Sequence, residues 1–152
     1  MGTLLITMVL IISGSAVAPW VITWYSSGNC TNLSYITGAD DGNHASLGVD
    51  GPPPELGWVL LDLGSGNEMP ANQLFTVYAS SASEENYNVY VVETTDLQYK
   101  LYVGNGDDTV DEDFTTPLSP PTGSYRYIYL EATSGVQTID YAFGPDIDAV
   151  GY

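Results

Sequence analysis

The sequence has very little positive charge and few residues suited to metal binding or nucleophilic chemistry. Its basic side chains are Lys100 and Arg126, against nineteen Asp and Glu, which gives a formal charge of −17. Affinity for phosphates depends on Lys and Arg, so binding to nucleic acid or to an anionic membrane through a basic patch is excluded. The only Cys is Cys30 and the only His is His44. An intrachain disulfide and a four-ligand Cys/His zinc site are therefore excluded as well.

Charge is missing altogether from the N-terminal part, because no Asp, Glu, Lys, Arg or His precedes Asp40. Residues 1–25 are dominated by Leu, Ile, Val and Met. At about 1.5 Å per residue, a helix over this segment is roughly 36 Å long, enough to cross a bilayer core of about 30 Å. We therefore predict a hydrophobic helix over 1–25. The alternative is a secretory signal, with Ala16 and Ala18 spaced like a cleavage site, although Pro19 after the cut disfavours cleavage.

Small residues in the middle of this segment favour packing between helices. Gly14 and Ala18 form a small-x-x-x-small pair, which lets two helices approach closely. Residues 2–12, Gly-Thr-Leu-Leu-Ile-Thr-Met-Val-Leu-Ile-Ile, resemble the hydrophobic N-terminal helix of archaeal type IV pilins and archaellins. The resemblance implies a filament whose core is a bundle of these helices, with globular domains displayed outside.

A short polar linker is predicted over residues 26–34. It contains two N-glycosylation sequons, at Asn29 and Asn32, which indicate an extracellular face. Cys30 lies between them and is interpreted either as a free or interchain-bridged thiol or as a buried inert one.

Residues 35–152 form the predicted acidic domain, which has an all-β pattern. Short apolar runs with period-two alternation are separated by Gly, Pro, Asn and Asp, as in a two-sheet sandwich or jelly roll. The predicted strands, the first of which begins at the end of the linker, are residues 33–37, 45–49, 58–63, 74–79, 87–93, 99–103, 125–132, 137–142 and 147–150.

Parts of this domain are similar to discoidin-type, galactose-binding-like jelly rolls. Residues 57–64, Gly-Trp-Val-Leu-Leu-Asp-Leu-Gly, resemble the strand of those modules that ends in Asp-Leu-Gly. Residues 126–130 resemble a later strand that begins with Arg, and residues 145–150 resemble the closing strand. The resemblance implies the jelly-roll fold more firmly than a ligand, because the modules include lectin-like binders and purely structural domains.

Acidic residues at both ends of the domain predict a structural calcium site. Carboxylate, amide and carbonyl oxygens suit Ca²⁺, and the resemblance implies that the first and last strands lie close together. The candidate ligands are Asp40, Asp41, Asn43, Asp146 and Asp148. The alternative is an Asp-Gly turn beside a solvated strand end. A second acidic group, residues 107–113, lacks EF-hand spacing and is predicted to be a solvated loop.

Two further patterns concern the strand at residues 125–132. Arg126 shares its strand face with apolar residues, so its guanidinium needs a carboxylate partner, and Asp62 and Asp148 are the candidates for a structural ion pair. Tyr125, Tyr127 and Tyr129 are predicted to share one face. Such aromatic rows stack on sugars or pack in cores and interfaces.

The sequence contains no catalytic set. His44 has no second His and no Gly-x-Ser-x-Gly nucleophile elbow to work with, so we expect no enzyme activity and no catalytic residues. Apart from the predicted structural Ca²⁺, no cofactor is implied.

Two functional hypotheses remain. The first is a structural subunit of an extracellular, pilus-like cell-surface appendage, held in the membrane before it assembles with copies of itself. The second is a membrane-anchored, lectin-like module that binds glycans.

Overall fold

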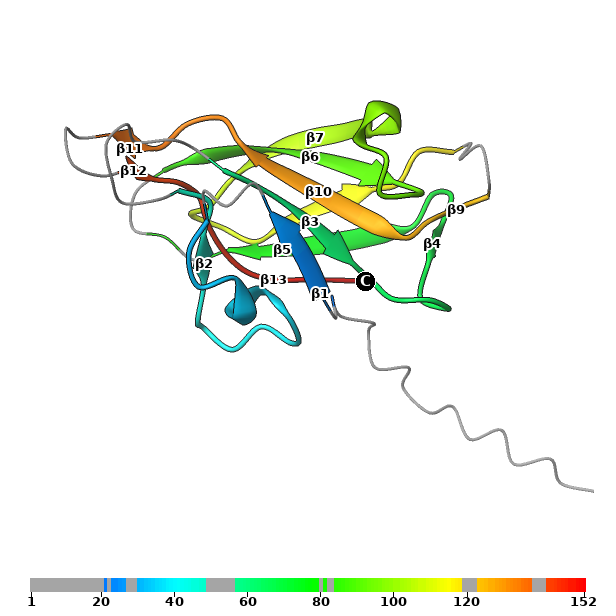
Figure 1. Ribbon diagram of the computed structural model, residues 1–152, viewed down its shortest axis with the longest axis horizontal. Coiled ribbons are helices and arrows are strands. Elements are labelled where there is room, and N and C mark those ends of the chain that lie inside the picture. Colours follow the sequence, from blue (N-terminus) through cyan, green and yellow to red (C-terminus); the bar gives the residue numbers. More distant parts are fainter. Residues whose placement is uncertain are drawn as a thin grey trace, which may run out of the picture.

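The computed structural model is a sandwich of two antiparallel sheets (Figure 1). It describes residues 21, 23–26, 30–48, 57–79, 81, 84–118, 123–137 and 142–152. The five-stranded sheet has the order β1 (Thr23–Ser26), β3 (Trp58–Asp62), β10 (Tyr127–Ala132), β6 (Asn86–Val92) and β7 (Leu101–Asp107). The four-stranded sheet has the order β2 (Ala45–Ser46), β13 (Asp146–Gly151), β5 (Leu74–Ala79) and β8 (Glu112–Thr115).

Shorter elements lie at the two ends of the sandwich. The pair β4 (Met69–Pro70) and β9 (Ser124–Tyr125) lies at one end, together with the 3-10 helix η2 (Leu97–Tyr99). The pair β11 (Val136–Gln137) and β12 (Ala142–Phe143) lies at the other end (Figure 1). A second 3-10 helix, η1 (Leu33–Ile36), follows the first strand.

The core lies between the sheets and is built by alternation along the strands. In β6, Tyr87, Val89 and Val91 all point inward and are fully buried. Phe75 and Val77 of β5 belong to the same buried cluster and come from the other sheet. Because successive side chains of a strand point to opposite faces, this period-two pattern gives each sheet one apolar inner face.

The sequence correctly predicted a jelly-roll β-sandwich and most of its central strands. Residues 74–79 match β5, and the predictions at 58–63, 87–93 and 147–150 differ from β3, β6 and β13 by one residue at one or both ends. The strand predicted at 99–103 begins two residues later, as β7, because η2 includes residue 99. Two predictions were wrong: residues 33–37 contain η1 instead of a strand, and β8 begins within the acidic group at 107–113, where a loop was predicted. Most of the strand predicted at 137–142 falls outside the described residues.

The end of the predicted N-terminal helix is a strand. Thr23–Ser26 form β1, which pairs with β3 so that Thr23 lies opposite Asp62 and Ser26 opposite Val59. Val21 is buried and its N–H donates to the Val150 carbonyl of β13, at 3.2 Å. The β-branched and aromatic residues here favour a strand once the edge of β3 is available for pairing. Residues 1–20, including Gly14 and Ala18, lie outside the described part of the chain.

The predicted linker at residues 26–34 is also largely part of the domain. Thr31 exchanges backbone hydrogen bonds with Ser46 of β2, at 2.9 and 3.2 Å. Leu33 is buried in the core as the first residue of η1. The β-sandwich therefore begins before residue 35. None of the helices in the described ranges has the length and apolar character to cross a bilayer.

Candidate functional site

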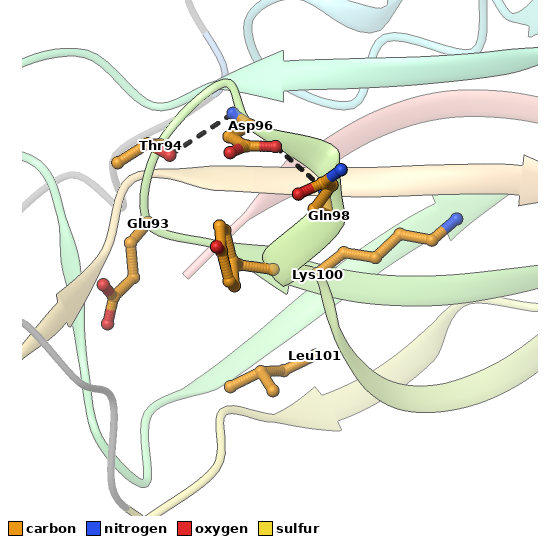
Figure 2. Close-up of a pocket in the computed structure, with 7 residues that line it drawn as sticks. Glu93, Thr94, Asp96, Gln98, Lys100 and Leu101 are labelled. Carbon is orange, nitrogen blue, oxygen red and sulfur yellow. Dashed lines mark hydrogen bonds between the residues drawn. The ribbon is translucent and has the colours of Figure 1, made fainter.

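A pocket of about 490 Å³ lies beside the loop that joins β6 to β7 (Figure 2). Its size falls within the range of small-molecule sites. Most of its lining side chains carry polar groups, and the ring of Tyr99 is 72% exposed. The lining residues are Glu93, Thr94, Asp96, Gln98, Tyr99, Lys100 and Leu101.

Hydrogen bonds within the loop hold its shape. Asp96 caps η2, because its Oδ1 accepts from the Gln98 N–H at 3.1 Å. The Asp96 N–H in turn donates to Thr94 Oγ1 at 3.3 Å (Figure 2). The Tyr99 N–H donates to the Asp96 carbonyl at 3.3 Å, which closes the turn that carries the exposed ring.

A β-bulge in β7 sets the direction of the strand as it leaves the pocket. Val89 pairs with Gly104 and Tyr90 pairs with Tyr102, so Val103 is the extra residue. Bulges bend a strand and redirect its side chains. Here the bulge places Tyr102 against Tyr90, with ring centroids 5.5 Å apart.

Lys100 lines the pocket but its ammonium is engaged elsewhere. Its Nζ lies 4.4 Å from the ring centroid of Tyr90 and 4.2 Å from that of Tyr129. It also lies 3.4 Å from Glu131 Oε2. In Figure 2 the Lys100 side chain extends away from Glu93 and carries its nitrogen to the far side of the loop. Cation–π contacts and the ion pair thus hold the loop against the outer face of the sheet.

Aromatic rings form a row across this outer face. Trp58 and Tyr129 lie 5.4 Å apart, and Tyr90 and Tyr129 lie 5.6 Å apart, between ring centroids. Tyr127 and Tyr129 belong to the outer-face cluster, whereas Tyr125 is buried in the core between the sheets. The prediction that Tyr125 shares their face is wrong, because Arg126 separates β9 from β10.

The structure pairs Arg126 with Asp62, one of its two candidate partners. Arg126 Nε lies 2.8 Å from Asp62 Oδ1, and Nη2 lies 3.0 Å from Oδ2, a bidentate arrangement. Burial raises the pKa of Asp62, but the Arg126 hydrogen bond and the Gly64 N–H outweigh it, so the pKa lies below its ordinary value. Gly64 has a φ of 86°, which suits glycine in the turn after β3.

This ion pair lies at the same end of the sandwich as the pocket. Tyr127 is opposite both Asp62 of β3 and Val92 of β6, so Arg126 and Glu93 extend from the same edge. Arg126 is thus paired at this end, whereas Lys100 extends from the pocket over the outer face to Glu131 of β10.

Four of the five predicted calcium ligands lie together where the first loop meets β13, and Asp146 lies apart from them. Asp148 is the extra residue of a bulge in β13, and its two oxygens accept from the backbone N–H groups of Asp41 and Gly42, at 3.2 and 2.6 Å. Asp41 Oδ1 accepts from the backbone and side chain of Asn43, both at 3.0 Å. Asp146 instead faces His44, with Oδ2 3.4 Å from Nε2.

Burial is the main influence on the two carboxyls of β13. It raises the pKa of Asp148, and the neighbouring Asp40 carboxyl raises it further. Burial likewise raises the pKa of Asp146, partly offset by His44. Within the described residues, no group of three or more His, Cys, Asp or Glu side chains is placed to hold a metal ion. Asp40, Asp41, Asn43 and Asp148 therefore join the first loop to the last strand, and calcium binding by these residues stays a prediction.

In the second acidic group Asp111 and Asp113 are exposed, as predicted for a solvated loop, whereas Asp108 is not. Asp108 is fully buried, and its oxygens accept from the N–H groups of Glu85 and Asp146, at 3.0 and 2.9 Å. Asp111 Oδ1 accepts from the Ala79 N–H at 3.1 Å. These contacts lie at the end of the sandwich opposite the pocket, since Glu85 precedes β6 and Glu93 follows it.

The remaining predicted residues lie away from the pocket. Cys30 is half-buried, with Sγ 3.5 Å from the Trp58 carbonyl. Asn32 is exposed and has a φ of 57°, and its carbonyl accepts from Tyr35 in η1. Asn29 falls outside the described residues. The pocket was not predicted from the sequence, where its one signal is the polar run around Asp96 between two predicted strands.

Comparison with solved structures identifies the architecture. The CBM32 of AlyQ, solved in complex with 4,5-unsaturated mannuronic acid, matches with a TM-score of 0.57 and 16% identity, over 90% of this chain and 98% of that one. The chitosan-binding module 1 of a chitosanase/glucanase from Paenibacillus sp. IK-5 matches with a TM-score of 0.59 and 16% identity, over 86% and 93%. The chain shares the jelly-roll β-sandwich fold of these two modules. No protein-family model and no curated protein matches the sequence.

Proposed function

We propose that this chain is a non-catalytic carbohydrate-binding module and that the pocket beside the β6–β7 loop holds the sugar. The observation that carries the proposal is a pocket of about 490 Å³, at one end of a jelly roll, that combines an exposed tyrosine with several polar groups. Both structural neighbours named above are carbohydrate-binding modules by their descriptions. The similarity to these modules concerns the fold, whereas the argument for sugar binding depends on the side chains that line the pocket.

The lining residues match what a sugar presents. The apolar face of a pyranose stacks on an aromatic ring, a role that suits Tyr99. Sugar hydroxyls donate to carboxylates and amides, which Glu93, Asp96 and Gln98 provide. Leu101 gives the pocket an apolar surface beside these groups. A few polar groups around an apolar and aromatic surface are typical of small-ligand sites.

A place at the cell surface belongs to the same proposal. Its support is the exposed sequon at Asn32 and the strongly acidic composition. The filament hypothesis depends on a helix over residues 1–25, of which 1–20 lie outside the described part and Thr23–Tyr25 lie in β1. The described residues thus favour the second hypothesis, glycan binding, over assembly into a filament.

The proposal predicts that Tyr99→Ala weakens glycan binding. Isothermal titration of the full chain with a panel of neutral, cationic and acidic oligosaccharides identifies the ligand. Loss of the stacking ring then lowers affinity about tenfold or more, which is about 1.4 kcal/mol. Tyr102→Ala is the matched control, because Tyr102 is 55% exposed and does not line the pocket. Equal affinity of the two variants, or no binding by any sugar in the panel, contradicts the proposal.

A further inference from the structure

We infer that the pocket selects sugars that carry a protonated amino group over neutral and uronic acid sugars. This inference rests on the proposed function and names the ligand class of the same site. It follows from how the charges around the pocket are arranged. Two carboxylates line the pocket, while the nearest ammonium is committed to contacts on the other side of the loop.

The carboxylates are Glu93 and Asp96. Figure 2 shows them on separate parts of the pocket, Glu93 where the chain leaves β6 and Asp96 at the start of η2. The capping hydrogen bond uses only Oδ1 of Asp96, so Oδ2 can accept from a ligand. An ammonium group that approaches either carboxylate gains a charge-assisted hydrogen bond, which is stronger than the bond from a neutral hydroxyl.

The cations that an acidic sugar needs are already paired. Lys100 lies over Tyr90 and Tyr129 and pairs with Glu131, and Arg126 forms its bidentate pair with Asp62. These are the only Lys and Arg of the chain. His44 faces Asp146 at the opposite end of the sandwich. A carboxylate in the pocket would meet the carboxylates of Glu93 and Asp96, while the ammonium of Lys100, which also lines the pocket, is directed to Glu131.

The overall charge acts in the same direction. A formal charge of −17 attracts cationic oligomers and repels anionic ones over distances of about a Debye length, roughly 10 Å at 0.1 M salt. This long-range electrostatic attraction does not depend on the pocket, so an experiment has to separate it from the contacts that a sugar makes with the lining residues.

The test compares three trisaccharides by isothermal titration: a glucosamine trisaccharide, its fully N-acetylated form and a mannuronate trisaccharide. At about pH 6 the amino groups are protonated. We expect the glucosamine trisaccharide to bind about tenfold more tightly than the N-acetylated one, and the mannuronate trisaccharide to bind weakest. Glu93→Gln and Asp96→Asn should each weaken binding of the glucosamine trisaccharide about threefold to tenfold more than binding of its N-acetylated form.

Glu84→Gln is the matched control, because Glu84 is exposed and lies outside the pocket. The substitution changes the net charge by the same amount as Glu93→Gln does. If this control reduces the preference as much as Glu93→Gln does, net charge explains it and the inference fails. If the neutral or acidic trisaccharide binds as tightly as the amino sugar and Tyr99→Ala abolishes that binding, the inference fails while the proposed function stands. If no sugar in the wider panel binds, both fail.

Discussion

Asp108 holds three segments of the chain together, and its removal should destabilise the sandwich strongly. The side chain is fully buried in the turn after β7 and accepts from the N–H groups of Glu85, before β6, and Asp146, at the start of β13. Hydrogen bonds to charged groups contribute roughly 1.5–3 kcal/mol each, and a buried donor left without a partner keeps its desolvation cost. Relief of repulsion with Asp146 offsets part of the loss.

We therefore expect Asp108→Ala to lower the free energy of unfolding by about 3 kcal/mol. For a domain of this size that corresponds to a fall in Tm of roughly 10 °C. Urea denaturation followed by tryptophan fluorescence measures the change. Asp107→Ala is the control, because within the described residues the Asp107 side chain accepts hydrogen bonds from Thr109 in its own turn and from no other segment. If Asp108→Ala costs no more stability than this control, the assignment of Asp108 as a link between the segments is wrong.

Two further predictions concern the acidic groups near β13. Folding raises the pKa of Asp148, so the folded state binds this proton more tightly than the unfolded chain and stability is lost as the pH rises through the raised pKa. Asp40→Asn removes a repulsion of about 1 kcal/mol and should raise the urea midpoint at about pH 7 but not at about pH 3; an equal change at both pH values contradicts this. If Asp40, Asp41, Asn43 and Asp148 hold a structural Ca²⁺ as predicted, millimolar Ca²⁺ should raise Tm by several degrees, and a Tm unchanged within about 1 °C by Ca²⁺ or by chelation would contradict the predicted site.

The sandwich could be predicted wherever the inner face of a strand alternates clearly. Tyr87, Val89 and Val91 recur at period two and all reach the core, and the Asp-Leu-Gly run ends β3 in the expected turn. Arg126 was expected to pair with a carboxylate because an apolar strand face leaves a guanidinium no other partner. These features are local, so the sequence contains them directly.

Other features depend on contacts between distant segments. Thr23–Ser26 continue an apolar run that predicts a helix equally well, and the edge of β3 makes them a strand. The acidic residues of β8 lie at a sheet edge, where charge is tolerated, so their composition resembles that of a loop. Asp108 is buried because two distant backbone N–H groups converge on it. The pocket results from the folding of the β6–β7 loop around η2, for which no sequence motif exists.

Chemical-shift mapping locates the sugar on the protein. The chain, labelled with ¹⁵N, is titrated with the oligosaccharide that binds it most tightly. We expect the largest amide shifts between Glu93 and Leu101, with Tyr99 among them, and unchanged amide shifts around His44 and Asp146 at the other end. Shifts centred on the His44 end or on the outer-face aromatic row, or no shifts with any sugar, would contradict this expectation.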